Sequence, residues 1–334
     1  MTKAKPPIQN NLNLSFNPHP LARNTHFQTI ASSFIKVKAP HLLAASREMI
    51  LNAGDGVRLQ GFYSPQPEGK SRGLILLLHG WLGQANAVYV LATGEHLYRQ
   101  GYSIFRLHFR DHGGTFHLNS GIFRSDLLDE AFSATQQIAA LEPARPFHII
   151  GASLGGSFAL RLAWRHTQTP VPNMAQTIAI NPSVNPYHTT LALDTSFFVY
   201  LAYFRRKWRR MFRNKKAAFP DLYPDIAAIL AAPTTMTMTE AFTSFGPYAT
   251  ALDYLNSYAV TPQMMSELQS NVTIITAADD PIVPVADFAP FVGVSPWLHL
   301  AIQPYGGHVG FIDIFPLRHW LSEAATAILA NSEF

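Results

Sequence analysis

Short aliphatic segments alternate with helical segments along most of this chain, and this alternation constrains its fold more than any other feature. Residues 74–78 read Leu-Ile-Leu-Leu-Leu, which suits a strand buried on both faces. Further strands are expected at residues 103–108, 147–150, 177–180, 272–277 and 298–302, and helices at residues 86–99, 125–140, 154–165 and 316–330. This order predicts an α/β fold with a mostly parallel central sheet and helices on both faces.

Two segments do not follow the alternation. Residues 182–268 are rich in aromatic residues, and they predict a helical cap inserted over the sheet. Residues 1–45 are rich in Asn and Pro and predict an arm that wraps the body. The core is then expected to consist of residues 46–181, which begin with a hairpin around Gly54-Asp55-Gly56, and residues 269–334.

Composition excludes several classes of protein. Hydrophobic residues make up 48% of the 334 residues and charged residues only 14%, which excludes a disordered chain. The absence of cysteine excludes disulfides, zinc-thiolate sites and a cysteine nucleophile. Lys3 and Lys5 are not followed by an apolar run, and no apolar segment is long enough to cross a bilayer, so we expect neither a secretory signal nor a transmembrane helix. A cytoplasmic location fits these features.

The sequence Gly151-Ala152-Ser153-Leu154-Gly155 is a G-x-S-x-G motif between a predicted strand and a predicted helix. Such a motif arises by chance in about one chain in ten of this length, so its position carries the argument. A sharp strand-to-helix turn leaves no room for side chains beside the serine and exposes its hydroxyl above the sheet. We therefore expect Ser153 to be a nucleophile.

A serine hydroxyl needs a base, and the base needs a group that orients it. In this kind of fold the acid and the histidine follow the serine in that order, in loops at the carboxyl ends of strands. Asp279 and Asp280 follow one predicted strand, and His308 follows the next. Asp280 is preferred to Asp279 because it precedes Pro281, but both remain candidates.

A turn after the strand at residues 74–78 is the expected place for an oxyanion hole. It reads His79-Gly80-Trp81, and the predicted donors are the backbone N–H groups of Trp81 and Leu154. The chain contains 14 histidines, yet it has no H-E-x-x-H motif and no phosphate-binding glycine motif. We therefore expect no metal and no cofactor.

Eight basic residues lie between residues 205 and 216, interleaved with aromatic residues. The rest of the chain has 17 basic and 21 acidic residues, so the basic character is local. The segment is either a cap helix with its apolar residues inward and a solvated basic face, or a patch that contacts an anionic membrane at the inner membrane face. Nucleic-acid binding is not expected. The candidate contact residues are Arg205, Arg206, Lys207, Trp208, Arg209 and Arg210.

These motifs together resemble the α/β-hydrolase superfamily, and within it the YheT-like branch of abhydrolase-domain proteins. Asn17-Pro18-His19-Pro20 and His26-Phe27-Gln28-Thr29 resemble a dispersed form of that branch's Asn-Pro-His-x-Gln-Thr stretch. The strand and turn at residues 105–110 resemble that branch's strand leading into a Phe-Arg-Gly turn. Asp111-His112-Gly113-Gly114 stands where the branch more often has Gly-Cys-Ser-Gly. The resemblance implies Ser153, Asp280 and His308 as a catalytic triad.

The resemblance also implies hydrolysis of carboxylic esters, with lipid esters among the candidate substrates. Three alternatives stay open at this point: a thioesterase, a non-catalytic protein that keeps the fold, and a membrane-surface binding protein. The same triad serves several acyl-transfer reactions, so the reaction subtype rests mainly on analogy. The acyl chain length and the oligomeric state are not determined by the sequence.

Overall fold

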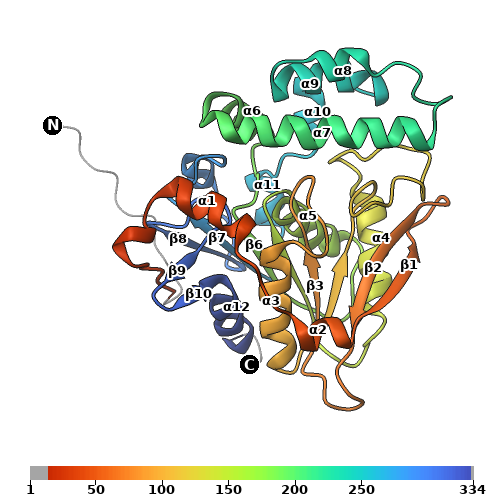
Figure 1. The fold of residues 1–334 in the computed structure, drawn as a ribbon. Helices are drawn as coiled ribbons and strands as arrows, with labels where there is room; N and C mark the ends of the chain where they lie inside the picture. Colours follow the sequence, from red (N-terminus) through yellow and green to blue (C-terminus); the bar gives the residue numbers. More distant parts are fainter. Residues whose placement is uncertain (1–13, 332–334) are drawn as a thin grey trace.

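The structure, a computed structural model, describes residues 14–331 and places an eight-stranded sheet at its centre (Figure 1). The strand order is β1-β2-β4-β3-β5-β6-β7-β8; β2 is antiparallel to β1 and β4, and the other neighbours are parallel. The predicted α/β fold and mostly parallel sheet are confirmed. The strands are β1 (Arg47–Asn52), β2 (Arg58–Ser64), β3 (Leu74–Leu78), β4 (Ser103–Leu107), β5 (Phe147–Ala152), β6 (Met174–Ile180), β7 (Asn271–Ala277) and β8 (Leu298–Gln303).

Helices cover both faces of the sheet and one of its ends. The α-helices are α1 (Thr25–Phe34), α2 (Pro40–Ala44), α3 (Val88–Arg99), α4 (Leu128–Ala139), α5 (Leu154–Gln168), α6 (Pro186–Thr195), α7 (Phe198–Ala218), α8 (Ala227–Ala231), α9 (Thr235–Phe242), α10 (Ala251–Ser257), α11 (Pro262–Ser266) and α12 (Trp320–Asn331). Short 3-10 helices are η1 (Pro20–Ala22), η2 (Thr243–Phe245) and η3 (Val285–Phe291). The expectations for the first thirteen residues, including the absence of a secretory signal, lie outside the described residues.

Alternate residues of β3 pack into two different hydrophobic clusters, one on each face of the sheet. Ile75 and Leu77 belong to a cluster with apolar residues of α3 and α12, on one face of the sheet. Leu74, Leu76 and Leu78 belong to a cluster with apolar residues of α4 and α5, on the other face. Because both faces are covered, every residue of the strand is buried, and this explains the unbroken aliphatic run in the sequence.

Most element boundaries agree with the prediction, and the largest difference lies near the carboxyl end. The helix expected over residues 316–330 begins only at Trp320. Leu317–His319 (β10) pairs instead with Ile312–Ile314 (β9) as a two-stranded antiparallel ribbon. Three-residue strands carry too little periodicity to be recognised in a sequence.

We call residues 182–268 the cap segment, and its regular elements are all helices, α6 to α11 with η2. Its longest helix, α7, spans 21 residues and lies across one end of the sheet (Figure 1). The buried residues Tyr200, Trp208 and Phe212 recur at helical spacing along one side of α7. The division into arm, core and cap segment stays a prediction.

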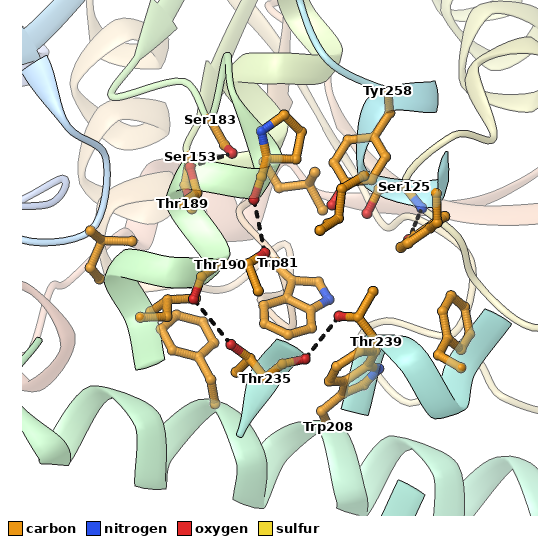
Figure 2. A pocket seen from close by; sticks show the side chains of 18 of the residues that line it. Trp81, Ser125, Ser153, Ser183, Thr189, Thr190, Trp208, Thr235, Thr239 and Tyr258 are labelled. Atoms are coloured by element: carbon orange, nitrogen blue, oxygen red, sulfur yellow. Dashed lines mark hydrogen bonds between the residues drawn. The ribbon is translucent and has the colours of Figure 1, made fainter. Parts of the chain in front are cut away.

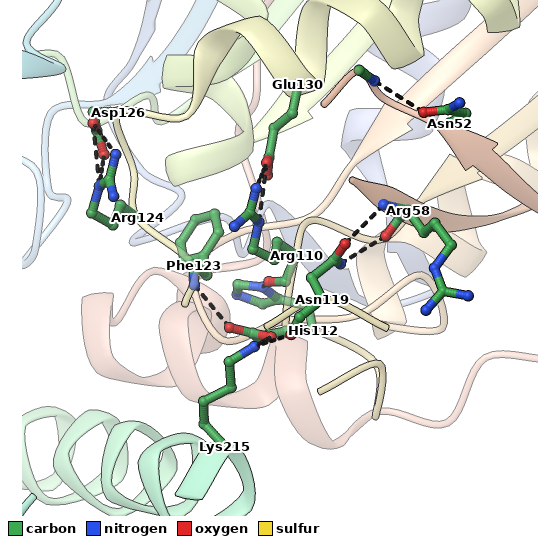
Figure 3. A network of polar contacts seen from close by, with 12 residues as sticks. Asn52, Arg58, Arg110, His112, Asn119, Phe123, Arg124, Asp126, Glu130 and Lys215 are labelled. Atoms are coloured by element: carbon green, nitrogen blue, oxygen red, sulfur yellow. Dashed lines mark hydrogen bonds and ion pairs between the residues drawn. The ribbon is translucent and has the colours of Figure 1, made fainter. Parts of the chain in front are cut away.

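A buried ion pair joins α7 to the loop that follows β4. Nζ of Lys215 lies 2.8 Å from Oδ1 of Asp111, and both side chains are fully buried. The ammonium also donates to the carbonyl oxygen of Asn119 at 2.6 Å, and Oδ2 of Asp111 accepts the N–H of Phe123 at 2.8 Å. Figure 3 shows Lys215 reaching from the helix into this loop. Burial raises the pKa of the Asp111 carboxyl and lowers the pKa of the Lys215 ammonium, so desolvation outweighs their attraction.

Removing one partner of this pair should be costly, because the other charge is then buried alone. We expect Lys215→Met to lower the free energy of unfolding by about 3–5 kcal/mol, measured by urea denaturation. The double variant Lys215→Met/Asp111→Asn removes both charges and keeps an acceptor for the Phe123 N–H, so it should recover most of that loss. A single variant as stable as the wild type would show that the ion pair does not hold α7 in place.

Candidate active site

Ser153 occupies a strained turn between β5 and α5. Its backbone has φ 56° and ψ −120°, a conformation that residues other than glycine rarely adopt. The flanking glycines are required by close backbone approach: a Cβ on Gly151 would lie 2.0 Å from the carbonyl oxygen of Gly155, and one on Gly155 would lie 2.4 Å from that of Leu78. The chain therefore turns sharply enough to present the serine at the carboxyl end of the sheet.

Three side chains predicted to act together form a chain of two hydrogen bonds with His308 in the middle. Nε2 of His308 is 2.9 Å from Oγ of Ser153, and Nδ1 of His308 is 2.9 Å from Oδ2 of Asp280. A carboxylate can only accept, so Nδ1 carries the ring proton and Nε2 is free to accept the serine proton. The geometry orients one neutral tautomer of the imidazole toward the hydroxyl.

The Asp280 carboxylate is fixed by several donors. Its side chain is fully buried, and its Oδ1 accepts the backbone N–H groups of Ile282 at 2.8 Å and Val283 at 2.9 Å. Its Oδ2 accepts the side-chain amide of Asn181 at 2.6 Å as well as the imidazole. Asn181 directly follows β6, and this place at the carboxyl end of a strand could have identified it in the sequence as a residue of the site.

Asp279, the alternative acid in the sequence, has a different set of partners. Its Oδ1 accepts the N–H of Gly307 at 2.9 Å, and its Oδ2 accepts the hydroxyl of Thr25 at 2.8 Å. It therefore links the loop that carries His308 to α1, while Asp280 contacts the imidazole.

Helix α1 of the arm packs directly against the His308 loop. Oγ1 of Thr29 accepts the backbone N–H of His308 at 3.0 Å and donates to the carbonyl oxygen of Thr25 at 2.8 Å. The buried Gln28 side chain accepts the N–H of Ile312 and donates to its carbonyl oxygen, both at 2.8 Å. A Cβ on Gly307 would lie 2.6 Å from Oγ1 of Thr29, so the glycines of this loop allow the close contact.

The turn after β3 passes beside the serine. A Cβ on Gly80 would lie 3.2 Å from Cβ of Ser153. Within residues 14–331, the backbone N–H groups of Trp81 and Leu154 have no hydrogen-bond acceptor. Two unpaired amides beside a serine are chemically suited to bind an oxygen that carries developing negative charge.

Two buried histidines shape this turn. Nε2 of His112 accepts the N–H of Leu82 at 3.1 Å, while its Nδ1 donates to the carbonyl oxygen of Arg110 at 2.7 Å. Nδ1 of His79 donates to the carbonyl oxygen of Gly80 at 2.8 Å. Burial lowers the pKa of His112 to about 4 and that of His79 well below its usual range, so both rings are neutral at neutral pH.

These histidines predict a loss of stability in mild acid. Burial also lowers the pKa of His108 to about 4. Between about pH 6.5 and 4 the unfolded chain binds protons at these histidines and the folded chain does not, so the free energy of unfolding should fall as the pH falls. His108 and His112 should each contribute about 2 kcal/mol to this loss at pH 5, and His79 acts in the same direction. Urea denaturation at pH 7.5 and pH 5 measures the effect.

His108→Asn is the matched variant for this prediction. Its amide can still donate to the Oε1 of Gln60, which Nδ1 of His108 contacts at 2.9 Å. The variant should therefore show a weaker pH dependence than the wild type. Equal stability of the wild type at both pH values would contradict the account.

Two pockets meet at Ser153 and His308. The smaller, of about 70 Å³, lies between the core and the cap segment, and many of its lining residues carry hydroxyl groups, among them Ser183, Thr189 and Thr190 (Figure 2). The larger, of about 880 Å³, is wider and runs between α7, α1 and the turn after β3. Trp81 and Phe204 line both pockets, and their rings stack with centroids 5.4 Å apart.

The basic segment lies on α7, but not all of its residues share one surface. Trp208 is only 4% exposed and packs against Trp81, so this predicted contact residue is not on the surface. Lys207 is half-buried, and its ammonium donates to the carbonyl oxygen of Leu82 at 2.7 Å and to the hydroxyl of Tyr203 at 2.9 Å. Arg206 and Arg210 are exposed, whereas Arg205 and Arg209 are half-buried. Contact with an anionic membrane stays a prediction.

No helix within the described part of the chain has both the length and the apolar character needed to cross a membrane. Among those same residues, no group of three or more histidine, aspartate or glutamate side chains is arranged to hold a metal ion.

Comparison with known proteins identifies the family. A family model described as "alpha/beta hydrolase fold" matches residues 73–313. An "Abhydrolase domain-containing protein" of Dictyostelium discoideum is 26% identical over 340 residues, covering 98% of this chain and 83% of that protein. "Putative esterase YheT" of Escherichia coli (strain K12) is 25% identical over 296 residues, covering 86% of this chain and 84% of that protein.

Solved structures share the fold at low identity. An esterase of Pyrococcus furiosus aligns with a TM-score of 0.58 and 16% identity, covering 90% of this chain and 96% of that one. Est1E of Butyrivibrio proteoclasticus, solved with ferulic acid bound, aligns with a TM-score of 0.57 and 15% identity, covering 85% of this chain and 98% of that one. The chain thus belongs to the alpha/beta hydrolase fold family, and within it the chain is similar to YheT.

Proposed function

We propose that this protein hydrolyses carboxylic esters, with Ser153 as nucleophile, His308 as base and Asp280 as the residue that orients the base. The observation that carries the proposal is the continuous relay from the buried Asp280 carboxylate through His308 to the Ser153 hydroxyl, with both hydrogen bonds at 2.9 Å. A relay of this geometry activates a hydroxyl that is otherwise a poor nucleophile.

In the first half-reaction, Oγ of Ser153 attacks the ester carbonyl carbon while Nε2 of His308 takes the hydroxyl proton. The carbonyl oxygen becomes an oxyanion and accepts hydrogen bonds from the N–H groups of Trp81 and Leu154. The bond to the alcohol oxygen then breaks, and His308 returns the proton to the departing alcohol. An acyl-serine remains.

In the second half-reaction, His308 removes a proton from water, and the resulting hydroxide attacks the acyl carbon. The bond to Oγ breaks and Ser153 regains its proton from His308, which releases the carboxylic acid. Asp280 remains ionised throughout and stabilises the imidazolium formed in both halves. No cofactor takes part in this scheme.

The site also suits a thioester, because the same nucleophile and oxyanion donors serve both acyl groups. A protein that only binds ligands would not need the aligned tautomer of His308 or two unpaired amides beside the serine. These features favour an enzyme over a non-catalytic protein that keeps the fold.

A panel of p-nitrophenyl esters with increasing acyl length, each matched to a thioester of the same acid, tests the proposal. We expect hydrolysis that His308→Ala abolishes. His188→Ala is the matched control, since His188 also contacts an aspartate, Asp287, but is about half exposed and lies outside both pockets. Equal loss of activity in both variants, or activity that survives His308→Ala, would contradict the mechanism.

A further inference from the structure

The larger pocket carries positive charge, which the ester-hydrolase proposal does not explain. Its charged lining residues, apart from the histidines, are Lys207, Arg210 and Asp111. Asp111 is fully buried and already paired with Lys215, so it does not offset the two cations. Arg210 is exposed and, among residues 14–331, has no hydrogen-bond or ion-pair partner.

The two cations follow Phe204 along α7. Phe204 lines the same pocket as Ser153, and Lys207 and Arg210 follow it by three and six residues on α7. At 1.5 Å per residue these positions lie about 5 Å and 9 Å further along the helix axis. Apolar side chains, including Phe34, Val88 and Tyr203, line the same pocket, which therefore suits a ligand that is apolar and also anionic.

The leaving alcohol is the part of the substrate best placed in the larger pocket. After the first half-reaction the acyl group stays on Ser153, whereas the alcohol must leave and water must enter. The wider pocket allows both movements, and the smaller pocket under the cap segment is left for the acyl group.

We infer, on the basis of the proposed function, that the natural substrates are esters whose alcohol part carries an anionic group, bound by Arg210 together with Lys207. Lys207 also holds the turn after β3 through the Leu82 carbonyl oxygen, so its replacement would disturb the oxyanion donors. Replacing Arg210 should change only the attraction of the pocket for an anion, because Arg210 holds no other part of the site in place.

The test compares phenyl acetate with 4-carboxyphenyl acetate, two esters that differ only by one carboxylate on the alcohol side. For Arg210→Glu, the ratio of kcat/KM for the anionic ester to that for the neutral ester should fall about threefold to tenfold relative to the wild type, mostly through KM. Arg206→Glu and Arg213→Glu are matched controls, since both arginines are exposed on α7 and line neither pocket, and their ratio should stay within about twofold.

Each outcome separates this inference from the proposed function. A wild type that hydrolyses neither ester contradicts the proposed function itself. Hydrolysis of phenyl acetate with an unchanged ratio in Arg210→Glu overturns only the assignment of Arg210. An equal fall in all three variants would indicate general attraction of anions to α7 and would also overturn it.

A second inference rests on separate contacts, those between α1 and the His308 loop. We infer that Thr29 is a positioning residue for His308, because its hydroxyl accepts the backbone N–H of the histidine itself. Asp279 and Thr25 brace the same loop through Gly307. The arm thus contributes to the site, although none of its described residues, 14–45, forms a hydrogen bond with the Ser153 hydroxyl.

Thr29→Val keeps the shape of the side chain and removes the acceptor, so it should lower kcat about tenfold with little change in KM, the size expected for one lost hydrogen bond. Thr29→Ser keeps the hydroxyl and should restore kcat. Thr135→Val is the control, since Thr135 likewise donates to the carbonyl oxygen four residues earlier but lies on α4, outside both pockets. An unchanged kcat in Thr29→Val, or a serine variant as slow as the valine variant, would overturn the assignment.

Discussion

Ser153→Ala is expected to lower kcat for ester hydrolysis by about 10⁴- to 10⁶-fold, because no other group can form the acyl intermediate. The residual rate would come from the oxyanion donors and from substrate binding. Initial rates on a short p-nitrophenyl ester, at enzyme concentrations high enough to detect the slow variant, measure this loss.

Ser157→Ala is the matched control for that variant. Ser157 lies one turn further along α5, is fully buried, and its hydroxyl has no hydrogen-bond partner among residues 14–331. Its removal should therefore leave kcat within about twofold of the wild type. Ester hydrolysis that survives Ser153→Ala unchanged would remove this serine from the mechanism.

Asp280→Asn is expected to lower kcat by about 10⁴-fold, the scale seen when an amide replaces the orienting carboxylate of a triad. The amide can donate to Nδ1 and so favours the wrong tautomer of His308, with its proton directed at Ser153. It also no longer stabilises the imidazolium. The same short ester assay measures the loss, with circular dichroism melting to establish that the variant is folded.

Asp279→Asn, at the neighbouring residue, is the matched control for this prediction. Asp279 braces the His308 loop from outside the relay, so its amide variant should lose no more than about tenfold in kcat. A larger loss in Asp279→Asn than in Asp280→Asn would reverse the assignment of the two carboxylates.

Local patterns in the sequence predicted most of the core. The aliphatic strands and the G-x-S-x-G turn depend on contacts close in sequence, and β3, β5 and α5 agree with their predicted starts. The choice of Asp280 over Asp279 rested on the following proline. The structure gives the physical reason, since Oδ1 of Asp280 accepts the two N–H groups of the turn that begins at that proline and leaves Oδ2 for His308.

Contacts between segments that are distant in the chain could not be predicted from the sequence. Gln28 and Ile312 are 284 residues apart and pair through a side-chain amide, which no periodicity can indicate. The sequence left two interpretations of the basic segment on α7 open. Trp208 is buried against the ring of Trp81, which agrees with a cap helix whose apolar residues point inward and not with a place for Trp208 in a membrane-contact patch. The ion pair of Lys215 could not be predicted either, because its partner, the buried Asp111, lies 104 residues away in the sequence.

Labelling with a fluorophosphonate probe, followed by mass spectrometry of the modified peptide, tests the central claim most directly. The account predicts one phosphonylated residue, Ser153, in the wild type, and no label in Ser153→Ala or His308→Ala. Undiminished labelling of Ser153→Ala, or an unreactive wild type that is folded, would contradict it.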